Sequence, residues 1–167
     1  MTASLPASDV ALRLGLTLLA SILFGLDRGF KGHPAGLRTM VLVGLAAALA
    51  MISAVALLAT EGKTSGSFGT MDVMRLPLGI LTGVGFIGGG TILRRGGLIT
   101  GITTAATLWI VTVIGLCFGA GQLGLGLSGT VLGTLTIWGL QRVEHSLPRK
   151  GHGALTIEAT EIGRAHV

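Results

Sequence analysis

The stretch Ile102–Gly119 reads ITTAATLWIVTVIGLCFG and contains no charged side chain. A run of this length and polarity is typical of a helix that crosses a lipid bilayer, which takes about 20 apolar residues. Similar stretches precede and follow it, so the sequence predicts an all-α membrane protein, a compact bundle of about five transmembrane helices. The other four stretches are Val10–Leu26, Thr39–Ala59, Leu76–Leu93 and Leu123–Leu140.

The composition of the chain also indicates a bilayer environment. Half of the 167 residues are hydrophobic, 11% are charged, and the mean hydropathy is +0.80. A soluble domain carries roughly 25% charged residues, so this chain lacks the charge needed to keep its apolar surface in water. The 29 glycines favour close contact between helices in lipid, because many of them lie inside the apolar stretches.

The distribution of Lys and Arg between the apolar stretches predicts the orientation. Eight basic residues follow the first, third and fifth stretches, whereas the other side holds only Lys63 and Arg75. Because basic residues accumulate in cytoplasmic loops, we expect the N-terminus outside and the C-terminus in the cytoplasm, as an odd number of spans requires. The eight residues are Arg28, Lys31, Arg38, Arg94, Arg95, Arg142, Arg149 and Lys150.

The sequence changes character after the fifth apolar stretch. We expect a transmembrane domain over residues 1–145 and a polar linker over 146–153. Residues 154–160 alternate between apolar and polar side chains as a strand does, which predicts the start of a truncated cytoplasmic α+β domain. Residues 161–167 read EIGRAHV and match one translation frame of a widely used sequencing adapter, so we expect an artefact there.

Three motifs keep a fixed order along the chain. They read GLDR at 25–28, HPAGLRT at 33–39, and GVGFIGGGTILRRGG at 83–97, the last continuing into GITTAATLW at 101–109. In residues, order and spacing they resemble the MgtC/SapB family of bacterial inner-membrane proteins, over roughly Leu12 to Gly121. The resemblance implies a multi-pass protein of the inner membrane, linked to growth at low magnesium and to survival inside host cells.

Two functions are consistent with this resemblance, and the sequence leaves both open. One is a non-enzymatic regulator of another membrane complex, such as the proton-driven ATP synthase, and the other is a carrier or channel for Mg²⁺ or another cation. A cation path is expected to use intramembrane acids, and residues 76–140 contain none, which favours the regulator. This chain differs from the usual family residues at four positions. The family often has Glu at the position of Asp27 and an acidic or amide residue at that of Gly29. It often has Gln at the position of Gly79 and Arg at that of Thr100.

Six residues are candidates for contact with a partner or with lipid headgroups, because the predicted topology gathers them on the cytoplasmic face. Asp27 either pairs with a nearby basic residue or supplies one carboxylate to Mg²⁺, and the lack of a second nearby acid favours the pair. Arg38 and Thr39 open the second stretch inside a family motif. The six residues are Asp27, Arg28, Arg38, Thr39, Arg94 and Arg95.

A second group of residues is expected to hold the helices together. Glycines of the third stretch allow backbones to approach, and threonine hydroxyls of the fourth can bond to a carbonyl one turn back or to a neighbouring helix. Asp9 and Arg13 are expected to pair because they lie one helical turn apart. The helix-packing candidates are Gly83, Gly85, Gly89, Thr103, Thr104 and Thr107.

The remaining reactive residue types suggest no cofactor, metal site or catalytic centre. Cys117 lies alone in an apolar run, and His33 and His152 have no partner at ligand spacing. The absence of tyrosine, and basic residues spread between apolar stretches, argue against nucleic acid as a partner. We expect contact with the bilayer and with another inner-membrane complex, and the sequence leaves homo-oligomerisation open.

Overall fold

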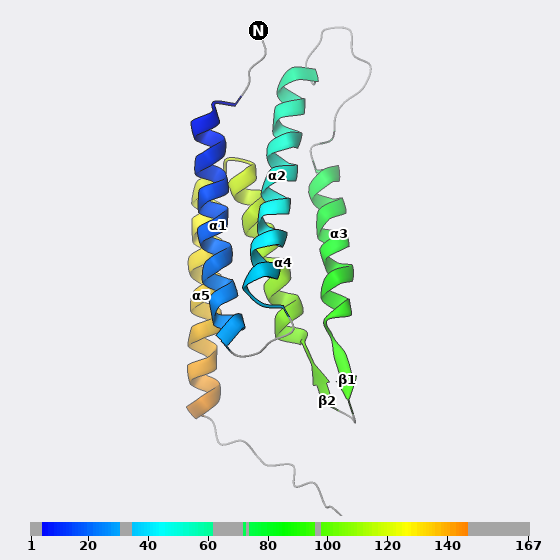
Figure 1. The fold of residues 1–167 in the computed structure, drawn as a ribbon, viewed down its shortest axis with the longest axis vertical. Coiled ribbons are helices and arrows are strands. Elements are labelled where there is room, and N and C mark those ends of the chain that lie inside the picture. The colour runs from blue at the N-terminus through cyan, green and yellow to red at the C-terminus, as the bar shows by residue number, and fades with distance from the viewer. Residues whose placement is uncertain (1–4, 31–34, 62–71, 73, 96–97, 147–167) are drawn as a thin grey trace, which may run out of the picture.

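A computed structural model describes residues 5–30, 35–61, 72, 74–95 and 98–146. This part of the chain forms five helices, with one β-hairpin between the third and the fourth (Figure 1). The expected strand at 154–160 and the expected artefact at 161–167 lie outside the described residues, as does all but the first residue of the linker. The elements are α1 (Ala7–Phe30), α2 (Leu37–Glu61), α3 (Arg75–Gly90), β1 (Leu93–Arg95), β2 (Leu98–Thr100), α4 (Ile102–Gly119) and α5 (Leu123–Ser146).

The helices form an antiparallel bundle centred on α4. Each helix runs opposite to the one before it in the chain, and α4 contacts all four of the others (Figure 1). Burial follows this arrangement, since 56% of the α4 span is buried but only 6% of the α5 span. The largest buried group joins α4 to α1 and α2, and it includes Phe24, Met40, Leu108, Val111, Ile114 and Phe118.

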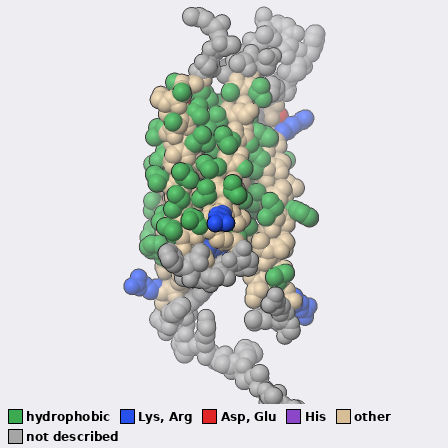
Figure 2. Space-filling model, in the orientation of Figure 1, with side chains coloured by type: hydrophobic (Ala, Val, Ile, Leu, Met, Phe, Trp, Pro, Cys, Tyr) green, Lys and Arg blue, Asp and Glu red, His purple; other side chains and the backbone are tan. Residues whose placement is uncertain are grey.

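Four of the helices are long and apolar enough to cross a membrane. These spans are Ala7–Arg28, Leu37–Leu58, Ile102–Gly119 and Leu123–Val143, so four of the five predicted stretches are confirmed as such helices. Large hydrophobic side chains remain exposed on their outer faces, for example Leu19, Leu42 and Leu132. Figure 2 shows such side chains over the middle of one face, as expected of a surface covered by lipid.

Helix α3 is shorter than the sequence predicts. The predicted stretch runs to Leu93, but the helix ends at Gly90 after 16 residues, a length of about 24 Å that is less than the ~30 Å hydrocarbon core. Glycine is a poor helix former, and three glycines in a row close the helix. The Thr91 N–H then bonds to the Gly88 carbonyl at 3.0 Å, which tightens the final turn.

The β-hairpin was not among the predicted elements. Strands β1 and β2 pair antiparallel, with Arg94 opposite Ile99. In the sequence, Gly96-Gly97 separates the two strands, and such a pair between β-forming residues is a hairpin signal that could have revealed it. Gly101 then connects the hairpin to α4 with a φ of 93°, where a side chain would collide with the Thr91 carbonyl.

Close packing between helices is made by glycines other than those expected. A Cβ at Gly115 would lie 2.5 Å from the Gly44 carbonyl oxygen, and one at Gly119 would lie 2.6 Å from that of Ala48, so α4 and α2 meet backbone to backbone. By contrast, a Cβ at any of the three predicted positions has no neighbour within 4 Å in this chain. This corrects the expectation of packing within the chain at Gly83, Gly85 and Gly89.

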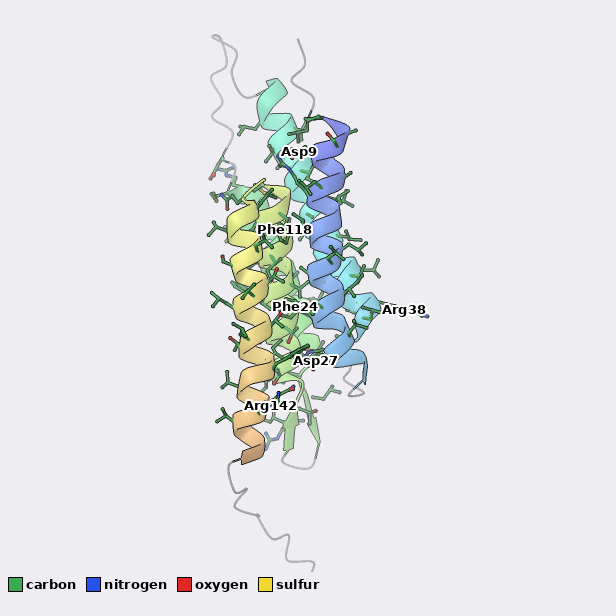
Figure 3. All side chains as sticks on the ribbon, turned by 90° about the vertical axis from the view of Figure 1, so that its left-hand side faces the viewer. Asp9, Phe24, Asp27, Arg38, Phe118 and Arg142 are labelled. Atoms are coloured by element: carbon green, nitrogen blue, oxygen red, sulfur yellow. The ribbon has the colours of Figure 1, made fainter. Side chains whose placement is uncertain are left out.

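Helix α5 attaches to the bundle through two aromatic rings that lie over glycines. The ring of Phe118 packs on Gly126, and the ring of Phe24 packs on Gly133, one from α4 and one from α1 (Figure 3). In both cases a Cβ would come within 2.7 Å of ring carbon atoms. The two glycines lie two turns apart on α5, and they therefore set its position along the bundle.

Candidate functional site

Charged residues of the described chain gather at the two ends of the bundle. At one end lie Asp9, Asp72 and Arg75, with Arg75 and Asp72 exposed and 3.7 Å apart. The other end, where α1 and α5 finish and α2 and α4 begin, we call the basic end (Figures 1 and 3). It holds Asp27, Arg28, Arg38, Arg94 and Arg142.

Arg28 lies inside the basic end and not on its surface. Its side chain is 2% exposed, and the guanidinium reaches from α1 into the first turns of α4. There Nη1 donates to the Thr104 hydroxyl at 2.8 Å and Nη2 donates to the Thr107 hydroxyl at 2.6 Å. Arg28 therefore joins α1 to α4, and its position does not fit the expected contact with a partner or with lipid headgroups.

The threonines of α4 divide between the interior and the surface. Thr104 and Thr107 are buried, whereas Thr103 is exposed. The Thr107 hydroxyl also donates to the Thr103 carbonyl at 2.6 Å, so it accepts from Arg28 while it donates one turn back. One hydroxyl proton and two lone pairs allow both bonds at once, and the donation to the Thr103 carbonyl leaves the lone pairs of the oxygen to accept from Arg28.

The remaining candidates for partner contact lie nearer the surface of the basic end. Arg38 is exposed in the first turn of α2 and points away from the bundle (Figure 3), and Thr39 beside it is half-buried. Arg94 is exposed on β1, and Arg95 follows it in the same strand opposite Leu98. Asp27 is half-buried and lines a groove with Arg142 of α5. The structure thus brings Asp27 near α5, which the sequence did not indicate.

A second buried arginine lies toward the opposite end of α1. Arg13 Nη2 donates to Asp9 Oδ2 at 2.6 Å, which confirms the predicted pair. Its Nη1 also donates to the Gly119 carbonyl at 2.8 Å, on the final turn of α4. Carbonyls there lack partners within the helix, and a cation at this end is favoured by the helix dipole. Sequence reasoning found the pair but missed the bond to α4.

The two arginines fix how α1 and α4 lie against each other. The same number of residues separates Arg13 from Arg28 on α1 as separates Thr104 from Gly119 on α4. Because the helices are antiparallel, Arg13 binds the last turn of α4 while Arg28 binds its first turns. A shift of α1 by one turn along α4, about 5.4 Å, would break both sets of bonds.

Among the residues described, no group of three or more His, Cys, Asp or Glu side chains could hold a metal ion. The acids of the described spans are Asp9 and Asp27, which lie near opposite ends of α1 (Figure 3). The polar groups that this part of the structure does bring together are guanidinium, hydroxyl and backbone carbonyl. These groups suit internal hydrogen bonding and the binding of anionic or zwitterionic groups at the surface.

This architecture defines the protein as a multi-pass protein of the bacterial inner membrane. The chain belongs to the MgtC family, whose sequence model matches residues 14–146. It is 36% identical over 145 residues to "Putative magnesium transporter YhiD" of Escherichia coli K12, a match that covers 87% of this chain. It is also 35% identical over 152 residues to SrpB of Synechococcus elongatus, covering 84% of this chain, and 35% identical over 121 residues to MgtC of Salmonella typhimurium, covering 72%.

These matches cover different shares of the relatives' own lengths. The aligned region spans 66% of YhiD, 81% of SrpB and 48% of MgtC. No solved structure matches the chain at a significant level. Membership of the family therefore rests on sequence, and it links the chain to a group of membrane proteins associated with magnesium.

Proposed function

We propose that this protein is a non-enzymatic regulator in adaptation to low magnesium, and that it acts by binding another inner-membrane complex, such as the proton-driven ATP synthase. The link to magnesium is supported by membership of the MgtC family and by the name of the relative YhiD. The choice of a regulator over a cation carrier is supported by the chemistry of the bundle interior.

The buried guanidinium of Arg28 carries this proposal. A Mg²⁺ path needs oxygen ligands that replace water, and the buried hydroxyls of Thr104 and Thr107 are two oxygens of the interior that could serve. Both already accept a hydrogen bond from Arg28. A divalent cation about 5 Å from a fixed positive charge is also destabilised by roughly 7 kcal/mol at an effective dielectric constant of 20. The interior is therefore better suited to holding helices together than to passing Mg²⁺.

The exposed surface offers a way to bind a partner. Helix α5 is mostly unburied and carries large apolar side chains along the bilayer depth, while Arg38 projects from the basic end (Figure 3). A membrane complex could contact the apolar faces within the bilayer and present an acidic group to Arg38. Arg38 is open to such a contact because its side chain is exposed and points away from the bundle.

The proposal is tested by capture and by ion flux on the same purified protein. Affinity capture from solubilised membranes should retain the ATP synthase, and Arg38→Ala should weaken capture about fivefold, as expected for an exposed charge worth ~1 kcal/mol. Arg75→Ala is the matched control, because Arg75 is exposed at the other end of the bundle and should leave capture unchanged. Liposomes that contain the protein should show no Mg²⁺ flux above empty vesicles, with or without a membrane potential.

Two results would count against the regulator. Capture that does not depend on Arg38, or that falls equally with Arg75→Ala, would remove the proposed contact. A saturable Mg²⁺ flux that Asp27→Ala abolishes would make the carrier the better explanation.

A further inference from the structure

A groove with three polar side chains and one indole opens at the basic end between α1 and α5. It has a volume of about 370 Å³ and is lined by Asp27, Trp138, Gln141 and Arg142, which we call the headgroup groove. Figure 3 shows Asp27 and Arg142 side by side near the ends of these two helices. The groove is distinct from the Arg28 cluster, by which we mean Arg28, Thr104 and Thr107, because the guanidinium of Arg28 turns inward to α4.

The depth of the groove matches the boundary between hydrocarbon and headgroups. The apolar span of α1 ends at Arg28, and that of α5 ends at Val143, so both spans end beside the groove. Trp138 is 53% exposed at this level, where indole rings are commonly found in membrane proteins. A molecule that enters the groove from the membrane therefore presents its headgroup there.

We propose that the headgroup groove binds phosphatidylethanolamine. The guanidinium of Arg142 can donate two hydrogen bonds to the phosphate, and the carboxylate of Asp27 can accept from the ammonium. The amide of Gln141 can donate to an ester oxygen, while Trp138 lies along the glycerol and the upper acyl chain. The groove offers one cation and one anion, and the ethanolamine headgroup carries one of each.

The charges of the groove discriminate between phospholipids. An anionic headgroup such as phosphatidylglycerol has a phosphate for Arg142 but is repelled by Asp27. Phosphatidylcholine has the right charges, but its quaternary ammonium has no N–H to donate. Asp27 and Gln141 each already take part in an interaction within the protein, and the Gln141 amide carries two N–H donors. A carboxylate has about four acceptor positions, so it can keep that interaction and still accept from an ammonium.

Bound lipid can be measured on the intact purified chain by native mass spectrometry. We expect phosphatidylethanolamine to be retained about tenfold more tightly than phosphatidylcholine or phosphatidylglycerol, since the charge-assisted bond to Asp27 is made with the first alone. Stepwise N-methylation of the ethanolamine should lower retention progressively, because each methyl group removes one donor. This series needs no variant, so it decides the proposal even if a substitution fails to fold.

Variants then identify the residues responsible. Asp27→Asn should abolish the preference for ethanolamine over choline, and Arg142→Gln should weaken retention of all three lipids about fivefold or more. Arg75→Gln removes an exposed arginine at the opposite end and should change neither quantity. The proposal is overturned by equal retention of the ethanolamine and choline lipids, by stronger retention of phosphatidylglycerol, or by an unchanged preference in a folded Asp27→Asn variant. Because none of these measurements involves a protein partner, they succeed or fail independently of the proposed regulatory role.

Discussion

The buried arginines show how single residues hold a membrane bundle together. A guanidinium inside a bilayer-spanning helix is costly unless hydrogen bonds replace its water. Arg28 obtains them from two hydroxyls of α4, and Arg13 obtains them from Asp9 and the Gly119 carbonyl. Hydrogen bonds that involve a charged group contribute about 1.5–3 kcal/mol each. The two ends of α1 are therefore attached to α4 by polar bonds, where apolar contact alone gives little specificity in lipid.

In the Arg28 cluster, we expect loss of the hydroxyl acceptors to destabilise the protein more than loss of the cation itself. Replacing both Thr104 and Thr107 with Val leaves a buried cation without its acceptors, and should lower the free energy of unfolding in detergent by about 3–5 kcal/mol. Arg28→Met removes the cation as well and should cost less, about 1–2 kcal/mol, because no charge is left buried. Thr103→Val on the exposed face of the same helix is the control and should stay within about 0.5 kcal/mol. If Arg28→Met is the more damaging change, the hydroxyls do not compensate the charge.

At the scale of the helices, glycine acts where backbones touch. Helices α2 and α4 meet at Gly115 and Gly119, whose missing side chains leave room for the carbonyls of Gly44 and Ala48. On α3, the predicted glycines Gly83, Gly85 and Gly89 have no neighbour, whereas Gly88 packs against Ala105 of α4. The same residue type is thus essential to helix contact at some positions and unconstrained at others.

Alanine at these positions should have opposite effects on stability. Gly115→Ala places a Cβ 2.5 Å from a backbone oxygen that cannot move without its helix, so we expect a loss of about 1–3 kcal/mol from overpacking. A Cβ at Gly83 has no neighbour, so Gly83→Ala should raise the free energy of unfolding by up to about 1 kcal/mol, because alanine is the better helix former. Thermal unfolding in detergent compares the two variants directly. Equal losses would mean that Gly83 has a neighbour in the purified protein.

The whole molecule is a bundle of five helices that alternate in direction and place most of the described basic residues at one end. Exposed arginines at the basic end include Arg38 in the first turn of α2 and Arg94 on β1. Helix α3 is the helix whose crossing of the membrane is least certain from its length, since its 16 residues are short for a full bilayer. Local thinning of the membrane, or the adjoining hairpin at the headgroup level, would let α3 cross.

Reporter fusions test this topology. We expect fusions after Gly66 and Gly121 to report the periplasm, and fusions after Gly32, Gly97 and Gly151 to report the cytoplasm, as the distribution of basic residues requires. Gly66 and Gly97 flank α3 in the sequence, so opposite signals at these two positions mean that α3 crosses the membrane. The same signal at both would contradict five spans and leave the four long helices as the transmembrane set.

The sequence alone determined the approximate bounds of the four helices that are long enough to cross a membrane. Apolar length is a local property, so the bounds Ile102–Gly119 agree with α4 and the predicted start at Leu123 agrees with α5. The Asp9–Arg13 pair was also predictable, because both residues lie on one helix and their spacing fixes their distance. Family membership followed equally from short motifs that keep their order.

Only the tertiary structure decided which side of each helix faces inward. In water a helix shows its buried face by an apolar stripe, but in lipid the outer face is apolar as well, so the pattern does not separate them. For this reason Gly83, Gly85 and Gly89 were predicted to be packed although they are open, and Arg28 was predicted to lie at the surface although it is buried. The headgroup groove depends on the same choice, because Asp27 of α1 lines it together with residues of α5, and α1 packs against α5 where Phe24 lies on Gly133. Polar bonds and glycine contacts between helices settle these orientations, and both arise from residues far apart in the chain.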